Sequence, residues 1–406
     1  MMRAASRRFS SAPAPLDVVL VSFARTPIGA FQGALAGVAA PALGAVAIRG
    51  ALARARVPGS AVDEVIMGNV VSAGLGQAPA RQAALRGGVR EAAACTTVNK
   101  VCASGMKALA LGAQSIALGA AEVVVAGGFE SMSGVPFYAP GARGGLRLGH
   151  AKLLDGVILD GLWDPGSDQH MGSCAEKTAR DYNITRAACD AWAERSYARA
   201  RAHAARGRDD AVEPVPVRVR GKDELVAADE EPGKGDPARF ASLRAAFQPD
   251  GGVITAANAS KLNDGAAAAV LMSGARARAL GLAPLARILA FADAEGPPVD
   301  FSTAPALAVP RALARARLTL KDVALHEINE AFASVVLANI AALKLDADAV
   351  NVHGGAVALG HPIGASGARI VGALVAALGE RGKGAIGVAS ICNGGGGATA
   401  MVVERM

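Results

Sequence analysis

The chain contains two weakly similar copies of one strand–helix unit, and this internal repeat constrains its fold more than any other feature. The hexapeptide ALARAR occurs at residues 51–56 and again at 312–317, an offset of 261 residues. Ser104-Gly105 and Ser366-Gly367 each open an Ala/Leu-rich helical segment, at an offset of 262 residues. Each of these helices leads into a strand-like segment. An offset that holds within one residue over several elements indicates a duplicated βαβα-type half.

Strand and helix patterns alternate in both copies. The first copy shows a buried strand, a helix, a strand and a further strand, at residues 17–24, 41–56, 62–70 and 121–128. The second copy repeats this order at residues 285–293, 304–317, 323–329 and 384–392. Such alternation predicts an α/β fold with right-handed crossovers and mostly parallel sheets.

An insertion at about residues 131–254 separates the two copies. It is rich in Gly and Pro at 134–149 and helical at 172–205, with a break near Asn183. Residues 213–231 are polar and strand-like. Because long insertions between core strands usually carry function, we expect a lid or a ligand platform here.

Composition narrows the class of protein. With 406 residues, the chain is longer than one hydrophobic core usually serves, and 52% hydrophobic against 19% charged residues describes a globular enzyme. The formal charge of +7 favours anionic partners such as phosphorylated cofactors, although Arg- and Ala-rich helix surfaces would produce the same surplus. Aromatic residues make up only 4%, which argues against a base-stacking nucleic-acid surface.

Five cysteines without a C-x-x-C pair suggest a reducing compartment and neither a disulfide framework nor a zinc ribbon. Residues 1–16 contain three Arg, three Ser and no acid, a composition typical of an organelle transit peptide. Residues 26–48 are uncharged, but Gly and Pro interrupt them, so we expect no membrane span.

Two thiols and an imidazole lie in Gly-rich turns. Cys102 comes just before a helical pattern, where the helix dipole and free N–H groups favour a nucleophilic thiolate. His361, in GHPIGASG, supplies a base whose ordinary pKa is near neutrality. Cys392 precedes NGGGG, whose backbone N–H groups suit a developing oxyanion. Asn329 stands at a strand end, where it could orient a water or a carbonyl. A core cysteine and a hydrogen-bonded loop histidine are the alternatives.

Other cofactor signatures are missing. No G-K-[ST] follows the glycine run, no G-x-G-x-x-G opens a helix after the first strand, and no zinc spacing occurs. Neither a nicotinamide cofactor nor a zinc site is therefore indicated.

Four motifs together resemble those of the thiolases, and most closely the short-chain, mitochondrial branch that acts on acetoacetyl-CoA. They are C-x-S at Cys102–Ser104, N-E-A-F at Asn329–Phe332, G-H-P at Gly360–Pro362 and C-x-G at Cys392–Gly394. Longer blocks such as NKVCASGMKA and SICNGGGGA match as well, and the resemblance runs from about residue 17 to the C-terminus.

The resemblance implies a thiolase fold of two pseudo-repeated βαβαβαββ halves in a five-layer αβαβα arrangement with an inserted loop domain. We expect an N-terminal half at 17–276, a C-terminal half at 277–406 and a transit peptide at 1–16. It also implies a homotetramer in the mitochondrial matrix, with no nucleic-acid or membrane partner.

The resemblance implies site residues too. Cys102 would be acylated, His361 would activate it, and Cys392 would move the α-proton of the second acetyl group. Asn329, through a water, and His361 would form one oxyanion hole, and the N–H groups of Cys102 and Gly394 the other. Coenzyme A would contact Tyr197, Lys234, Gly235, Asp236, Arg239 and Ser260. An activating potassium ion would be held by Tyr197, Ala256, Ala257, Ala259 and Val357.

The activity implied is acetyl-CoA C-acetyltransferase: two acetyl-CoA give acetoacetyl-CoA and coenzyme A through an acyl-cysteine. The alternatives are a broader-range 3-ketoacyl-CoA thiolase of β-oxidation and a non-catalytic acyl-CoA-binding relative.

One departure from the family pattern concerns substrate choice. Branch members that accept 2-methyl-branched substrates carry Phe-Pro where this chain has Phe301-Ser302.

Overall fold

The computed structural model describes residues 17–207, 211–219 and 221–406, so the expected transit peptide lies outside the described residues. Within these ranges, ten strands form one sheet in the order β14-β15-β16-β13-β1-β12-β5-β3-β4, with β2 beside β12. The strands of this sheet are β1 (Val18–Arg25), β2 (Gly29–Ala30), β3 (Glu64–Gly68), β4 (Ala94–Val98), β5 (Val123–Ser131), β12 (Asn263–Ser273), β13 (Ala286–Glu295), β14 (Leu325–Ile328), β15 (Ile386–Asn393) and β16 (Gly397–Arg405).

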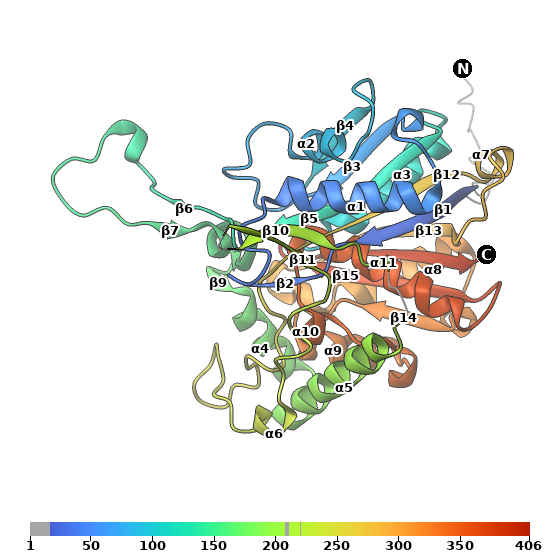
Figure 1. The fold of residues 1–406 in the computed structure, drawn as a ribbon. Helices are drawn as coiled ribbons and strands as arrows, with labels where there is room; N and C mark the ends of the chain where they lie inside the picture. The colour runs from blue at the N-terminus through green and yellow to red at the C-terminus, as the bar shows by residue number, and fades with distance from the viewer. Residues whose placement is uncertain (1–16, 208–210, 220) are drawn as a thin grey trace, which may run out of the picture.

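Helices cover both faces of the sheet and run between its two halves (Figure 1). They are α1 (Ala40–Ala55), α2 (Pro79–Arg86), α3 (Ser104–Ala117), α4 (Met171–Asp181), α5 (Arg186–Ala205), α6 (Pro237–Phe240), α7 (Gly274–Ala279), α8 (Pro305–Ala316), α9 (Ala333–Leu343), α10 (Ala356–Leu359) and α11 (Ile363–Gly379). The eight core elements expected from the two copies are confirmed, with ends shifted by at most three residues.

The expectation of mostly parallel sheets is wrong. Among the described strands of the large sheet, β3 pairs in parallel with β4 and β5, and β14 with β15. The central strands β5, β12, β1, β13 and β16 pair antiparallel. Two strands joined by a helix lie parallel only where that helix crosses over between neighbouring strands of the sheet. In contrast, β15 and β16 form a hairpin, and the two strands of a hairpin are antiparallel.

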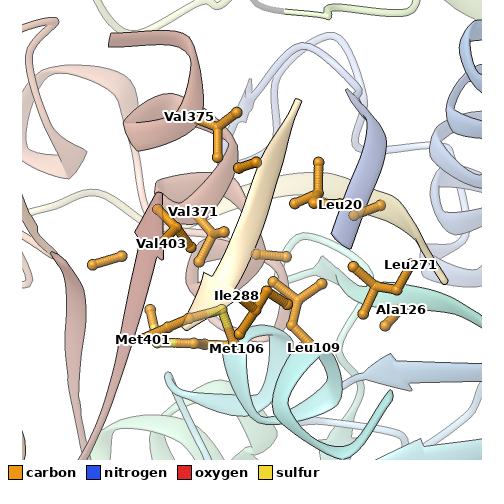
Figure 2. Close-up of a cluster of buried hydrophobic side chains, with 14 of the residues drawn as sticks. Leu20, Met106, Leu109, Ala126, Leu271, Ile288, Val371, Val375, Met401 and Val403 are labelled. Carbon is orange, nitrogen blue, oxygen red and sulfur yellow. The ribbon is translucent and has the colours of Figure 1, made fainter. Parts of the chain in front are cut away.

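Side-chain alternation along the strands divides the core into layers. On β1, Val18 and Leu20 face a central cluster with α3 and α11, whereas Val19 and Val21 face an outer cluster with α1. On β16, Met401 and Val403 face the same central cluster, and Val402 faces α8 in a third cluster. Figure 2 shows the central cluster, which includes Met106 and Leu109 of α3 and Val371 of α11. The order of layers is therefore αβαβα, as expected.

The internal repeat is confirmed in three dimensions. The two ALARAR segments end equivalent helices, α1 and α8, and each helix is followed by an arginine in the left-handed conformation: Arg56 (φ 54°) and Arg317 (φ 58°). The backbone N–H of each arginine bonds to carbonyls of the last turn, so the two copies share one helix ending.

The insertion forms a platform over one end of the sheet. It contributes α4, α5, α6, the short η3 (Ile158–Leu162) and three small strand pairs. These pairs are β6 (Phe137–Tyr138) with β7 (Leu154–Asp155), β8 (Trp163–Asp164) with β9 (Gln169–His170), and β10 (Val215–Val219) with β11 (Lys222–Val226). The segment between β6 and β7 extends away from the body as an arm (Figure 1). No helix in the described part of the chain combines the length and apolar character needed to cross a bilayer.

Candidate active site

Cys102 lies in a strained turn between β4 and α3. Val101, directly before it, has a φ of +45°, which is unusual for a β-branched residue and costs conformational energy. Ser104 stabilises the turn, since its hydroxyl accepts from the Lys100 N–H at 2.8 Å and donates to the Val101 carbonyl at 2.5 Å. The thiol is therefore held just before the N-terminus of α3, as the sequence predicted.

His361 lies between α10 and α11, in the loop that begins at Gly360. Gly360 has a φ of +101°, and a Cβ there would lie 2.4 Å from Oδ1 of Asn263, so glycine is required. The same Asn263 oxygen accepts from the His361 backbone N–H at 2.8 Å, which fixes the position of the loop.

The ring of His361 has one nitrogen anchored and one facing the site. Its Nδ1 lies 2.6 Å from Oγ of Ser366, whose hydroxyl proton is donated to the Pro362 carbonyl at 3.0 Å. Ser366 must then accept a hydrogen bond from Nδ1–H, which leaves the lone pair on Nε2. Nε2 lies 3.4 Å from Nδ2 of Asn329. This tautomer provides a general base.

Asn329 and Cys392 come together because β14 and β15 are parallel neighbours that end at the same edge. The Asn329 N–H donates to the Ser390 carbonyl at 3.0 Å. The Oδ1 atom of Asn329 is buried and has no hydrogen-bond partner within the described residues, so it is available to a water or a substrate group. Cys392 precedes the Gly394–Gly396 turn that joins β15 to β16, and its thiol is buried.

One cavity of about 560 Å³ joins these groups. Cys102, His361 and Gly394 line it, and its walls are largely apolar, with Met132, Phe301 and Phe332 among them. Cys392 does not line the cavity but belongs to the same buried cluster as Phe301 and Phe332. Three of the catalytic candidates thus line one pocket, Cys392 packs with two of its wall residues, and Asn329 contacts His361.

Burial favours the neutral forms of the two thiols and the imidazole in the resting site. Burial raises the pKa of Cys102 to about 11, although a hydrogen bond from the Gly394 backbone opposes this rise. The helix terminus and free N–H groups favour the thiolate, but desolvation of the buried thiol is the larger effect. Burial, with the nearby Arg369 charge, lowers the pKa of His361 to about 3. A neutral imidazole is the form that can accept the thiol proton. Burial and the neighbouring Cys102 also raise the pKa of Cys392.

The residues expected to bind coenzyme A divide into two groups. Lys234 and Ser260 line the cavity. Gly235 packs against the buried Tyr197 ring, where a Cβ would lie 2.3 Å from Cε1. Asp236 caps α6 by accepting from the Ala238 N–H at 3.2 Å, and Arg239 is exposed on that helix. Thus Tyr197 and Gly235 lie behind the wall of the cavity rather than on it.

The residues expected around potassium do gather, but around a group that sequence reasoning missed. The Lys261 ammonium bonds to the carbonyls of Ala257, Ala259 and Val357. Tyr197 lies against it, and Ala256 faces the cavity. Lys261 directly follows the TAANAS block. A lysine so close in sequence to the expected carbonyls was the feature that could have revealed its role.

Glu130 is a second missed residue. Its two buried oxygens accept from the Asn69 side chain and from the N–H groups of Val70, Val71 and Gly364. It thereby ties the end of β5 to the loop after β3 and to the first turn of α11. Its position at the end of a buried strand was the available signal. A thiol, a neutral imidazole and a glycine-rich turn that line one cavity can together serve covalent transfer through sulfur.

Known proteins share the sequence and the fold of this chain. Residues 18–275 match the family model described as thiolase, N-terminal domain, and residues 282–405 match thiolase, C-terminal domain. Acetyl-CoA acetyltransferase 1 of Arabidopsis thaliana is 53% identical over 97% of this chain and 95% of its own. The mitochondrial acetyl-CoA acetyltransferase of Rattus norvegicus is 50% identical over 100% of this chain and 95% of its own. A crystal structure of the Acat5 thiolase of Ascaris suum in complex with coenzyme A superposes with a TM-score of 0.91 at 47% identity, covering 96% of this chain and 100% of that one.

Proposed function

The chain belongs to the thiolase family, and we propose that it is an acetyl-CoA C-acetyltransferase, which condenses two acetyl-CoA reversibly to acetoacetyl-CoA and coenzyme A. The observation that carries this function is the cavity shared by Cys102, His361 and Gly394, in a chain half identical over its length to proteins of that name.

In the first half-reaction we assign the nucleophile to Cys102. Nε2 of His361 takes the thiol proton as the sulfur attacks the acetyl carbonyl, and the carbonyl oxygen becomes an oxyanion. The backbone N–H groups of Cys102 and Gly394 stabilise it. The carbon–sulfur bond to coenzyme A then breaks, and coenzyme A leaves with the proton held by His361. The product is acetyl-Cys102.

In the second half-reaction we assign the base to Cys392. Nε2 of His361 first takes the Cys392 thiol proton, and the Cys392 thiolate then removes the α-proton of a second acetyl-CoA. The protonated His361 and a water on Asn329 stabilise the enolate oxygen. The enolate carbon attacks acetyl-Cys102, the bond between the acetyl carbon and the Cys102 sulfur breaks to release acetoacetyl-CoA, and His361 returns its proton to the Cys102 thiolate. Because burial raises the pKa of Cys392, its thiolate is a strong base once formed.

We assign coenzyme A to the platform side of the cavity. Lys234 and Ser260 line this side, and Arg239 is exposed on the adjoining helix α6. Cationic side chains here suit the phosphates of coenzyme A. The carbonyls of Ala257, Ala259 and Val357, the position for which potassium was expected, accept hydrogen bonds from the Lys261 ammonium.

We further propose a homotetramer in the mitochondrial matrix. The support for assembly is the arm between β6 and β7, which exposes Leu146, Leu148 and Leu153. The support for location is the acid-free, Arg- and Ser-rich segment 1–16, together with the mitochondrial names of vertebrate relatives. Light scattering of the purified protein tests the first, and fusion of residues 1–16 to a fluorescent protein tests the second.

A chain-length series tests the activity. Thiolysis of acetoacetyl-CoA should exceed thiolysis of longer 3-ketoacyl-CoA substrates in kcat/KM. Equal or faster cleavage of the long substrates would instead identify a broad-range thiolase of β-oxidation. Binding of acyl-CoA without any cleavage would identify a non-catalytic relative.

A further inference from the structure

The ammonium of Lys261 lies in a cage of backbone carbonyls beside the substrate cavity. Its Nζ donates to Val357 O at 2.8 Å, Ala259 O at 3.1 Å and Ala257 O at 3.4 Å. An ammonium has three protons, so these carbonyls use its whole donor capacity. Nζ also lies 5.1 Å from the centroid of the Tyr197 ring, whose face attracts a cation.

The cage joins three segments that are distant in sequence. Ala257 and Ala259 belong to the turn that also places Ser260 on the cavity, Val357 belongs to α10, and Tyr197 belongs to α5. Helix α10 leads directly into Gly360 and His361. One cation therefore holds the coenzyme A side of the cavity and the loop of the catalytic histidine in a fixed relation.

The charge on Lys261 fits this arrangement. Burial lowers the pKa of the amine to about 8, and the negative charges of Glu231 and Glu330 oppose that change. The amine is thus protonated at neutral pH. The hydroxyl-bearing ring of Tyr197 faces the same group, and burial raises its pKa to about 12, so it stays neutral. All the groups of the cage around the ammonium are therefore neutral. Carbonyl oxygens and an uncharged aromatic ring suit a monovalent cation.

We propose that Lys261 is a built-in monovalent cation, a positioning residue whose ammonium takes the place in this cage that an alkali metal ion would otherwise fill. The inference rests on the proposed function, since it concerns how the same cavity is organised for coenzyme A. With the Lys261 ammonium in the cage, the enzyme is independent of potassium, whereas the resemblance alone suggests a potassium site.

The first test uses the unaltered protein. Acetoacetyl-CoA thiolysis is measured at fixed ionic strength in potassium, sodium and tetramethylammonium chloride. The proposal requires the same kcat and the same KM for coenzyme A in all three salts. A saturable rise in rate with potassium would overturn it, because the cage would then admit the metal ion.

The second test compares two substitutions. Lys261→Ala vacates the cage, so the KM for coenzyme A should rise in tetramethylammonium by roughly 5- to 150-fold, the usual range of coupling between two sites, and potassium should restore it. Lys261→Met fills the cage with an apolar chain, so potassium should not restore it. The exposed Lys321→Ala is the matched control and should behave like the unaltered enzyme in every salt.

Thermal unfolding separates this inference from the proposed function. Potassium should raise the midpoint of Lys261→Ala relative to tetramethylammonium and leave that of the unaltered protein unchanged, whatever substrate the enzyme uses. Equal midpoints of Lys261→Ala in the two salts, or full activity of this variant without potassium, would overturn the role of Lys261. Absence of thiolysis by the unaltered enzyme in all salts would overturn the proposed function instead.

Discussion

At the residue scale, the reactivity of this site depends on which nitrogen of His361 carries the proton. Ser366 donates its own proton to the Pro362 carbonyl, so it can only accept from Nδ1–H. Nε2 is then left as a base toward the cavity. The spacing GHPIGAS placed the serine one helical turn into α11, but only the folded loop shows that its hydroxyl meets the ring.

We predict that Ser366→Ala lowers kcat by roughly tenfold or more, a part of the 10²- to 10⁴-fold that a general base contributes. The KM for acetoacetyl-CoA should change little, because Ser366 is fully buried beneath the histidine. Steady-state kinetics at several pH values measure both effects. Ser115→Ala on α3 is the control, and an equal loss in both variants would contradict the role assigned to Ser366.

Buried neutral histidines also predict how stability depends on pH. Burial lowers the pKa of His326 to about 4, whereas an unfolded histidine titrates near 6.5. As pH falls below 6.5, the unfolded chain binds a proton that the folded chain does not, so stability falls. The loss from His326 is about 2 kcal/mol between pH 7 and pH 5. Urea unfolding should show a smaller loss for His326→Leu than for the unaltered protein, and equal losses would contradict it.

At the element scale, Glu130 joins three elements through four N–H donors. Burial raises its pKa, and the donors oppose that rise because they stabilise the carboxylate. Glu130→Gln would turn an amide NH₂ toward N–H groups and leave at least one donor unsatisfied. We predict a loss of about 1–3 kcal/mol in the free energy of unfolding, measured with urea. The exposed Glu91→Gln should lose almost nothing; a similar loss there would refute the argument.

Most elements could be predicted from the sequence, because long apolar runs and repeated helix patterns are local signals. The direction of the strands was mispredicted, since the pairing of β1 with β12 and β13 joins residues more than 240 positions apart. Cys102, His361, Cys392 and Asn329 were found because their motifs are short and chemically distinctive. Lys261 and Glu130 were missed because most of the backbone groups that surround them come from segments distant in sequence, which only the fold brings together.

At the scale of the whole molecule, the duplication brings the thiol and the imidazole together. The repeat aligns Gly105 of α3 with Gly367 of α11, and these two glycines lie where the central helices cross. A Cβ on Gly367 would lie 2.5 Å from the Met106 nitrogen, and one on Gly105 would lie 2.9 Å from the Ala368 nitrogen. The close approach of the two helices sets the separation of Cys102 and His361.

We predict that Gly367→Ala lowers the free energy of unfolding by about 1–3 kcal/mol, the usual cost of overpacking. The direction of this change in stability is informative, because in an uncrowded helix interior alanine is more stabilising than glycine by about 1 kcal/mol. Gly379→Ala, at the open end of the same helix, is the matched control and should not destabilise. Urea unfolding measures both, and a stabilised Gly367→Ala would contradict the crossing described.

The central claim is that Cys102 carries the acetyl group between the two half-reactions, and mass spectrometry of the acid-quenched enzyme tests it most directly. After brief exposure to acetyl-CoA, the peptide that contains Cys102 should carry one acetyl group, with one equivalent of coenzyme A released. Cys102→Ala should carry none, and His361→Asn should acquire it more slowly. Rapid turnover with an unmodified Cys102, or acetylation found only at Cys392, would contradict the account.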